Sequence, residues 1–265
     1  FHFFPGETIL SVGSWGCNLN CEFCQNWEIS KDRPKVLKHV MPQQLIQIAT
    51  ERKSKGIAFT YNEPIVSFEF ILDTSRAASK EGIYSVLVTN GVIEREPMEL
   101  LAQSMRAMNI DIKGWNDDFY KKEIGTDKAN VLRSIEIALK SGVHMELTTL
   151  IIPGKNDSPE EMEEEALWIK NLSPDIPLHI NRYFPNYHYT APATEVESLL
   201  ELASKAKEHL NYVYVGNVAL EGYNDTLCPN CGNLLVERRD YNVVVSGVDE
   251  KGRCTSCQRE ISLVF

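Results

Sequence analysis

The sequence of 265 residues predicts an α/β fold: a partial (β/α)6 TIM-type barrel followed by a small C-terminal cysteine domain of the zinc-ribbon or rubredoxin-like kind. Short runs rich in β-branched residues alternate with longer amphipathic stretches, which is typical of strand–helix units around a parallel sheet. After about Asn224 this alternation gives way to short strands, glycines and paired cysteines. We therefore expect a barrel domain over residues 1–222 and a four-cysteine, metal-binding domain over residues 223–265.

The strand and helix candidates follow one another over the first 182 residues. Strands are predicted at Thr8–Val12, Gly56–Thr60, Ser85–Thr89, Met108–Ile112, His144–Ile151 and Leu178–Arg182. Helices are predicted at Pro42–Ser54, Ile65–Glu81, Pro97–Ser104, Lys128–Ser141 and Pro159–Asn171, with Ser158 as a cap and Gly142 as a helix stop. Because the carboxyl ends of parallel strands meet on one face, the polar segments that follow these strands should surround one pocket.

The composition describes a globular chain with 43% hydrophobic residues and a formal net charge of −10. A negative charge disfavours broad contact with nucleic acid or an anionic membrane, because both attract cationic proteins. No run approaches the roughly 20 apolar residues of a membrane span, and the first ten residues lack the features of a secretory signal. We therefore expect a cytoplasmic protein whose partners are small molecules or other proteins, and not nucleic acid or a membrane.

Three of the seven cysteines lie in one short loop, GCNLNCEFCQNW. Cys17, Cys21 and Cys24 have the spacing CxxxCxxC, which brings three thiolates close enough to bind three irons of a cubane cluster. Cubane clusters are usually held by four cysteines, so three leave one iron open to a substrate. The residues alone also allow a zinc site completed by a distant His or Asp, or three metal-free cysteines.

This loop, with Phe23 directly before the third cysteine, resembles the signature of the radical S-adenosylmethionine (SAM) superfamily. The stretches CQNWEIS, FTYNEP, DIKGW and IPGKNDS are similar to the AmmeMemoRadiSam group, homologues of the pyruvate formate-lyase activating enzyme. The resemblance implies a [4Fe–4S] cluster whose open iron binds the amino and carboxylate groups of SAM, with Phe23 beside the adenine. It also implies a further segment ahead of Phe1.

The segment Thr60-Tyr61-Asn62-Glu63-Pro64 resembles the Gly-Gly-Glu-Pro type of segment that binds the SAM amino group, with Tyr61 and Asn62 in place of the glycines. A carboxylate suits this role, because an ammonium group in a dry pocket needs a charge-assisted acceptor. We expect Asn62 and Glu63 to bind the cofactor. A simple Asn-Glu-Pro turn is the alternative.

Two later segments, Thr89-Asn90-Gly91 and Asp111-Ile112-Lys113, resemble those that lie along the methionyl end of SAM in the activating enzymes. We carry over Thr89, Asn90, Asp111 and Lys113 as cofactor-binding residues; a common turn and a solvated ion pair are the alternatives. Val88 stands where some relatives have Asp, which leaves open a monovalent cation near Asp111. The segment around Asn181 and Arg182 is expected to face the adenosine and the substrate, although Arg182 equally suits a structural salt bridge.

The other four cysteines form two CxxC pairs, Cys228 with Cys231 and Cys254 with Cys257. Four soft thiolates in two such turns suit tetrahedral Zn²⁺, which would also fold a segment too small to have its own core. Zinc is therefore expected, with a rubredoxin-type iron or an auxiliary iron–sulfur cluster as alternatives.

The resemblance implies a radical SAM oxidoreductase, similar to the pyruvate formate-lyase activating enzyme. In such enzymes a low-potential donor of the ferredoxin or flavodoxin type reduces the cluster, and cleavage of SAM gives a 5′-deoxyadenosyl radical that abstracts a hydrogen atom. We expect a homologue that activates a glycyl-radical protein under anaerobic conditions. The alternatives are radical modification of a small molecule or another protein, cleavage of a different C–S bond, and a non-catalytic iron–sulfur redox or electron-transfer module.

Overall fold

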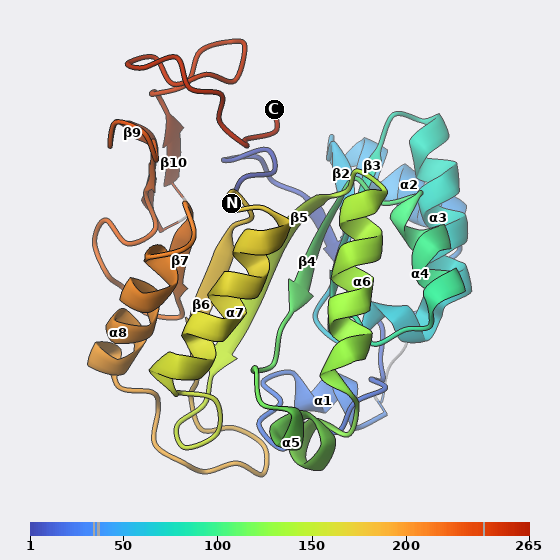
Figure 1. Cartoon of the computed structure of the whole chain (residues 1–265). Helices are drawn as coiled ribbons and strands as arrows, with labels where there is room; N and C mark the ends of the chain where they lie inside the picture. The colour runs from blue at the N-terminus through green and yellow to red at the C-terminus, as the bar shows by residue number, and fades with distance from the viewer. Residues whose placement is uncertain (34, 36–37, 241) are drawn as a thin grey trace. The chain divides into compact units, whose positions relative to one another are not determined.

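The computed structural model describes residues 1–33, 35, 38–240 and 242–265 and has an α/β fold (Figure 1). Its parallel sheet has seven strands in the order β1 to β7. The strands are β1 (Leu10–Val12), β2 (Gly56–Phe59), β3 (Tyr84–Thr89), β4 (Ala107–Asp111), β5 (His144–Ile151), β6 (Leu178–Arg182) and β7 (Val213–Gly216). The expected α/β class and the six expected strands are confirmed, to within a few residues at their ends.

The parallel sheet contains one strand–helix unit more than was predicted, so within the described part of the chain it has seven strands and not six. Helix α8 (Val196–Lys207) and strand β7 follow the last strand that was predicted. Strand β7 has only four residues, VYVG, and lies close to the paired cysteines, where the alternating pattern fades. A strand this short carries little periodicity of its own, and its pairing with β6, Ile180 opposite Val215, comes from the sheet.

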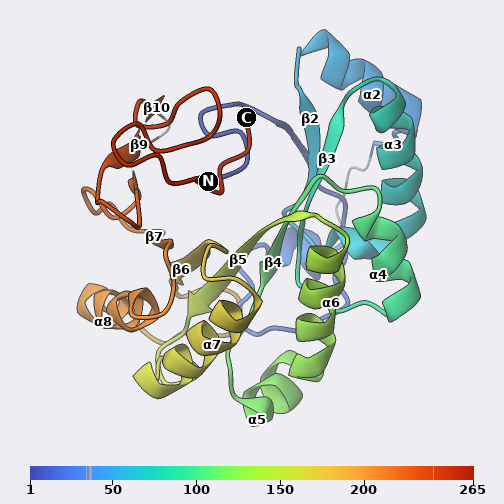
Figure 2. The ribbon, with the colours of Figure 1, turned by 45° about the horizontal axis from the view of Figure 1, so that its top comes forward.

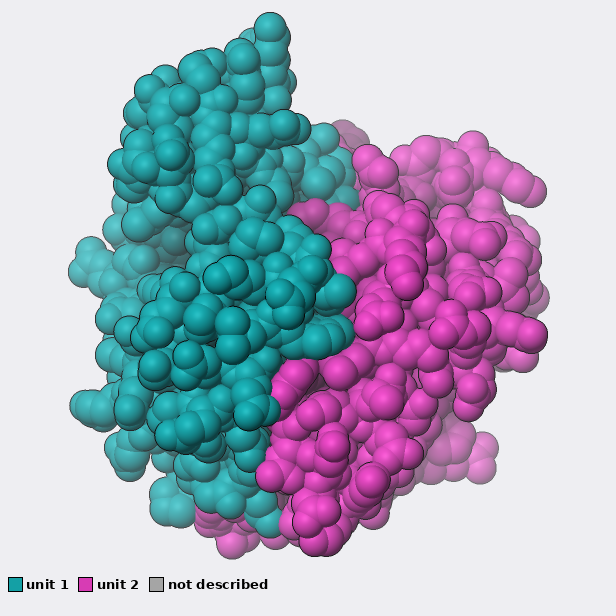
Figure 3. Space-filling view, viewed as in Figure 1, with its two compact units in different colours: residues 1–7, 146–184, 192–265 teal, residues 8–145, 185–191 magenta. Residues whose placement is uncertain are grey.

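The chain divides into two compact units, which Figure 3 colours separately. The first unit comprises residues 1–7, 146–184 and 192–265, and the second comprises residues 8–145 and 185–191. Residues 223–265 lie within the first unit, and their status as a separate domain stays a prediction. None of the helices in the described part of the chain is long and apolar enough to cross a membrane.

The second unit holds β1 to β4. Figure 2 shows β2, β3 and β4 with helices α2, α3, α4 and α6 along them. Ile57, Leu87 and Ile110 on these strands have no exposed surface, and full burial of each such side chain stabilises the fold by roughly 1.5–3 kcal/mol. Gly142 (φ 78°) ends the last helix of this unit as predicted. The helical segments are α1 (Trp27–Ser30), α2 (Pro42–Glu51), η1 (Pro64–Ser67), α3 (Phe68–Lys80), α4 (Arg95–Ala102), α5 (Asp117–Phe119), η2 (Tyr120–Ile124) and α6 (Lys128–Lys140).

The first unit holds most of β5, together with β6 and β7, helices α7 (Pro159–Leu172) and α8, and a small antiparallel sheet. Helix α7 begins as predicted, because the Ser158 hydroxyl accepts a hydrogen bond from the backbone N–H of Glu161. The small sheet has the order β10–β9–β8 and is made of β8 (Thr226–Leu227), β9 (Leu234–Arg239) and β10 (Asn242–Val245).

Candidate functional site

The cysteine loop follows β1 in the second unit and is held by backbone hydrogen bonds. The N–H of Gly16 donates to the backbone carbonyl of Ile29 (2.8 Å), and the N–H of Cys24 donates to the backbone carbonyl of Cys21 (3.3 Å). Cys21 is buried, while Cys17 and Cys24 are half-buried. The three cysteines therefore lie in one loop whose backbone is held by hydrogen bonds, and their role as cluster ligands stays a prediction.

Burial raises the pKa of the Cys17 and Cys21 thiols, although the nearby lysines Lys31 and Lys113 oppose the shift. Desolvation disfavours a thiolate that has no metal, whereas a coordinated metal ion deprotonates a thiol. These sulfurs therefore suit metal ligands better than free nucleophiles.

Glu63 lies in the second unit, in the segment between β2 and η1, and is only 3% exposed. One carboxylate oxygen accepts hydrogen bonds from the Thr89 hydroxyl (2.6 Å) and the Ile65 N–H (3.1 Å). The other oxygen accepts from the Asn90 N–H (2.7 Å). Burial nevertheless raises the pKa of Glu63 to about 7, against these donors and assisted by Asp111. A cation placed here would recover the charged form.

Tyr61 and Asn62, which stand in place of the glycines of the Gly-Gly-Glu-Pro type of segment, have separate structural roles. Tyr61 adopts φ of 76°, a left-handed conformation that favours glycine, and the Asn26 side chain donates to its carbonyl (2.7 Å). The Asn62 amide accepts from the Ser14 N–H (2.9 Å) and donates to the Gly16 carbonyl (2.9 Å). Asn62 thus connects the segment after β2 to the start of the cysteine loop.

A cavity of about 730 Å³ in the second unit is lined in part by the segments that follow β1 and β2. Ser14, Asn62 and Ser67 contribute polar groups to its lining, and Lys38 and His39 contribute basic groups. Apolar side chains, among them those of α2 and α3, form the rest of its wall. The Asn62 amide therefore borders both this cavity and the cysteine loop.

Asn90 contacts both Glu63 and the cysteine loop. Its backbone N–H bonds Glu63, and its side-chain amide donates to Asn18 Oδ1 (2.9 Å) and lies 3.8 Å from Cys17 Sγ. The following Gly91 has φ of 70°, and a Cβ there would approach Ile110 to 2.9 Å. Glycine is thus required directly after Asn90, so this turn is more specific than an ordinary loop.

Asp111 and Lys113 form an ion pair of 2.6 Å at the end of β4. The Lys113 side chain is 18% exposed, so the pair is partly withdrawn from water. Burial opposes the charge, but Asp111 and Cys21 outweigh it and raise the pKa of Lys113. The backbone N–H of Lys113 also donates to the hydroxyl of the fully buried Tyr120 (2.9 Å). A fixed ammonium group therefore lies beside the cysteine loop.

Phe23 is buried and stacks on Phe119, with ring centroids 6.2 Å apart and planes inclined by 15°. Sequence reasoning missed both Phe119 and Tyr120, which lie in the short segments α5 and η2. Two aromatic residues directly after Asp117 and Asp118, in a stretch with no predicted element, are the signal that was available.

The segment Pro185–Ala191 belongs to the second unit and binds the cysteine loop. The N–H groups of His188 and Tyr189 both donate to the Glu22 carbonyl, at 2.9 and 3.0 Å. The Tyr187 ring stacks on Trp27, with centroids 5.5 Å apart. We call residues 185–191 the strap. Its partners lie about 160 positions earlier, so no local pattern indicates the contact.

Asn181 and Arg182 lie on β6 in the first unit, where each has a local partner. A Cβ on Gly216, which pairs with Asn181, would come within 2.0 Å of Asn181 Oδ1. The Arg182 guanidinium donates to the Thr194 carbonyl (2.7 Å) and covers the Phe184 ring.

The four C-terminal cysteines come together in the first unit, with all four sulfur atoms within 4.8 Å of one another. The Sγ atoms of Cys228 and Cys257 are 3.5 Å apart, and those of Cys231 and Cys254 are 3.7 Å apart. Tetrahedral bonds of about 2.3 Å to one ion would place the sulfurs about 3.8 Å apart. The donor set therefore fits a single zinc or iron ion, and the cluster could bind either.

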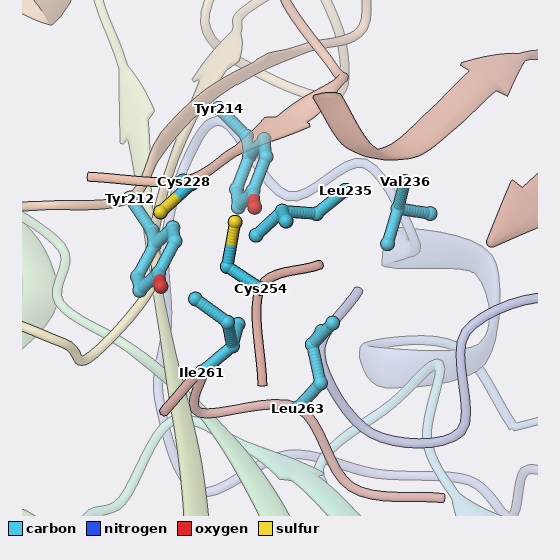
Figure 4. Close-up of a cluster of buried hydrophobic side chains, with 8 residues drawn as sticks. All are labelled: Tyr212, Tyr214, Cys228, Leu235, Val236, Cys254, Ile261 and Leu263. Carbon is cyan, nitrogen blue, oxygen red and sulfur yellow. The ribbon is translucent and has the colours of Figure 1, made fainter. Parts of the chain in front are cut away.

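Each CxxC turn closes in the same way. The N–H of Gly232 donates to Cys228, and that of Gln258 donates to Cys254. Both Gly232 and Gln258 have positive φ. Cys228 and Cys254 are also core residues (Figure 4). They pack in one buried cluster with Tyr212, Tyr214, Leu235, Val236, Ile261 and Leu263.

Residues 13–167, more than half of the chain, match the family model of the radical SAM superfamily. The chain belongs to this superfamily. The matched residues include the cysteine loop, Glu63, the Thr89–Gly91 turn and the Asp111–Lys113 pair.

Two relatives of this radical SAM protein have similar sequences. An uncharacterized protein of Methanocaldococcus jannaschii is 39% identical over 271 residues, covering 100% of this chain and 80% of the relative. The pyruvate formate-lyase-activating enzyme of Clostridium pasteurianum is 26% identical over 161 residues, covering 59% of this chain and 67% of that enzyme. The relationship to the activating enzymes is thus real but distant.

A solved structure has a similar fold. Streptococcus suis SuiB, bound to the precursor peptide SuiA, superposes with a TM-score of 0.64 at 16% identity. The match covers 82% of this chain and 49% of SuiB, so the chain spans about half the length of that protein. At this identity the likeness shows the fold alone.

Membership of the superfamily implies a [4Fe–4S] cluster and SAM, and the donors of the second unit fit both. Three soft thiols in one loop match a cluster that leaves one iron for another ligand. The buried Glu63 carboxylate matches an ammonium group, and the Lys113 ammonium matches a carboxylate. These are the charged ends of the amino-acid part of SAM.

Proposed function

We propose that this protein is an enzyme that binds a [4Fe–4S] cluster through Cys17, Cys21 and Cys24 and reductively cleaves SAM. The observation that carries the proposal is the buried carboxylate of Glu63, which three hydrogen-bond donors hold and whose pKa is raised by burial, in the same unit as the cysteine loop. When bound, these cofactors would supply the chemistry of C–S bond cleavage in SAM, which gives a 5′-deoxyadenosyl radical for hydrogen abstraction.

In this proposal the Glu63 carboxylate accepts hydrogen bonds from the amino group of SAM. Thr89 and Asn90 hold its two oxygens in place, so the carboxylate needs no reorientation when the ligand arrives. Asn62 contributes by fixing the segment that carries Glu63 against the cysteine loop.

Lys113 attracts the carboxylate of SAM, and Asp111 holds the Lys113 ammonium in position. Phe23, backed by Phe119, provides an apolar surface for the adenine. That Asn181 and Arg182, at the end of β6, face the adenosine or the substrate stays a prediction from the sequence.

For the substrate, we favour a protein that acquires a glycyl radical. The 26% identity to the Clostridium pasteurianum activating enzyme supports this choice. SuiB, which shares the fold, is bound to a precursor peptide, so peptide modification is the second candidate. Radical chemistry on a small molecule is the third.

A non-catalytic redox module is the competing function of a different class. An electron carrier has no use for a buried carboxylate such as Glu63 or for a paired ammonium such as Lys113, because burying either group costs free energy. The Glu63 site therefore favours the enzyme. A low-potential donor of the ferredoxin or flavodoxin type and anoxic conditions in the cytoplasm complete the proposal.

For the C-terminal cysteines we propose a structural zinc ion. Cys228 and Cys254 take part in a buried core, which favours a closed site that stabilises the fold over one that exchanges ligands. Elemental analysis of the purified protein tests this assignment, and a rubredoxin-type iron would show instead as visible absorption.

The function is tested by anaerobic reconstitution with iron and sulfide, reduction with dithionite in the presence of SAM, and chromatography for 5′-deoxyadenosine. Cys24→Ala is the control for cluster dependence. Formation of 5′-deoxyadenosine by the wild type alone is the expected result. An intact cluster that binds SAM and never cleaves it would support the redox module instead.

A further inference from the structure

We propose that the side chain of Asn90 sets the reduction potential of the [4Fe–4S] cluster by donating an N–H···S hydrogen bond to Cys17. The proposal rests on the proposed function, since it requires the cluster at the cysteine loop. Asn90 acts as a positioning residue through Cys17 and does not itself touch a reacting atom. Its amide nitrogen lies 3.8 Å from Cys17 Sγ.

The orientation of the Asn90 amide is fixed by its neighbours. Its carbonyl oxygen accepts from the Val92 N–H (2.9 Å), so the NH₂ group must lie at the other end, toward Cys17 and Asn18. Asn18 is oriented in turn, because its own NH₂ donates to the Val92 carbonyl (2.8 Å) and leaves its oxygen to accept from Asn90. The sulfur therefore faces a donor, and a flipped amide would break both of these bonds.

Burial strengthens this interaction. Asn90 is 5% exposed, so water does not compete for its amide, and a hydrogen bond in this environment is electrostatically stronger than one at the surface. The Leu19 N–H also lies 3.4 Å from the same sulfur. Two donors thus converge on Cys17, one from the loop itself and one from the turn after β3.

The sign of the effect follows from charge. One-electron reduction adds negative charge to the cluster and its thiolates, and hydrogen bonds to the sulfurs are among the factors that set the potential. An N–H donor stabilises the more negative, reduced form. Loss of the Asn90 donor should therefore make the potential more negative.

The same residue separates this effect from SAM binding. The contact of Asn90 with Glu63 uses the backbone N–H, which every substitution except proline retains. The contact with Cys17 uses the side chain. A side-chain variant therefore alters the cluster environment and leaves the backbone hydrogen bond to Glu63 in place.

The test is a redox titration of the reconstituted protein, followed by electron paramagnetic resonance, for wild type, Asn90→Asp and Asn90→Leu. Both variants resemble Asn in size and lack the NH₂ donor, but only one can carry a charge. We expect a more negative midpoint potential in both, with unchanged iron and sulfide content. In resonance Raman spectra, the wild-type iron–cysteine stretch should shift in D₂O by more than the same band in the variants.

Asn18→Ala serves as a further variant, because Asn18 is exposed and its loss frees the Asn90 amide without filling or emptying the core. Because the Val92 N–H still orients the Asn90 amide in this variant, the potential should shift by less than in the Asn90 variants. Unchanged potentials in all variants that retain the cluster would overturn the role of Asn90. A wild type that assembles no reducible four-iron cluster would instead overturn the proposed function, so the two failures are distinguishable.

Discussion

The Thr89 hydroxyl donates a hydrogen bond of 2.6 Å to Oε1 of the buried Glu63 carboxylate. This bond joins the end of β3 to the segment after β2, and the Asn90 N–H holds the second oxygen from the same turn. A carboxylate fixed in this way is ready to bind a cation. The first two predictions follow from this arrangement.

Thr89→Val should weaken SAM binding about ten- to hundredfold, because it removes a charge-assisted donor worth roughly 1.5–3 kcal/mol and leaves the carboxylate less well oriented. Calorimetric titration of the reconstituted protein with SAM measures the change. Thr89→Ser, which retains the hydroxyl, is the matched control and should bind nearly as the wild type does. Equal affinities in Thr89→Val and Thr89→Ser would show that the hydroxyl does not matter for binding.

Glu63 should make the ligand-free protein less stable as the pH rises. Burial raises the pKa of Glu63 from 4.5 to about 7. The stability that protonated Glu63 gives to the folded state is therefore fully present below about pH 4.5. It is lost as the pH rises through 7. The shift corresponds to about 3 kcal/mol of unfolding free energy. Urea unfolding between pH 5 and 8 should show this loss in the wild type and a flatter profile in Glu63→Gln; parallel profiles would contradict the raised pKa.

The strap should order the cysteine loop. Tyr187→Ala removes the stack on Trp27, which is worth about 0.5–1.5 kcal/mol, and loosens the hydrogen bonds from the strap to Glu22. Hydrogen exchange should then show faster exchange of the amides in residues 17–24. Tyr187→Phe preserves the ring and should protect the loop as the wild type does. Identical exchange in the Ala and Phe variants would argue that the loop is rigid without the strap.

Removal of the zinc ion that we propose at the C-terminal cysteines should unfold the small sheet around the CxxC turns. Cys228 and Cys254 share a buried core with Tyr212 and Tyr214, so loss of the ion leaves these two thiols in that core without the bonds that join them to Cys231 and Cys257. A strong chelator, or Cys254→Ala, should make residues 226–263 sensitive to limited proteolysis. Ser256→Ala, within the same turn, is the control. Resistance to proteolysis after complete metal loss would show that the core alone maintains this segment.

The predictable features are those whose chemistry is local. The six predicted strands follow from runs of β-branched residues, and both sets of cysteines follow from spacings of two or three residues between them. Strand β7 was missed because four residues carry no distinct period, and its place is set by pairing with β6. Segments α5 and η2 were missed for a similar reason, although they bring Phe119 to Phe23 and Tyr120 to Lys113.

By itself, the sequence determined the α/β class, the two sets of cysteines and the resemblance of the segment around Glu63 to a SAM-binding segment. Only the tertiary structure decided that Glu63 is buried between donors, that Asn90 turns its NH₂ toward Cys17, and that the strap bonds Glu22. The physical reason is that side chains only a few residues apart along the chain are close in space in any fold, so their spacing in the sequence predicts a shared site. Burial, amide orientation and contacts across 160 positions depend on how side chains pack once the chain has folded.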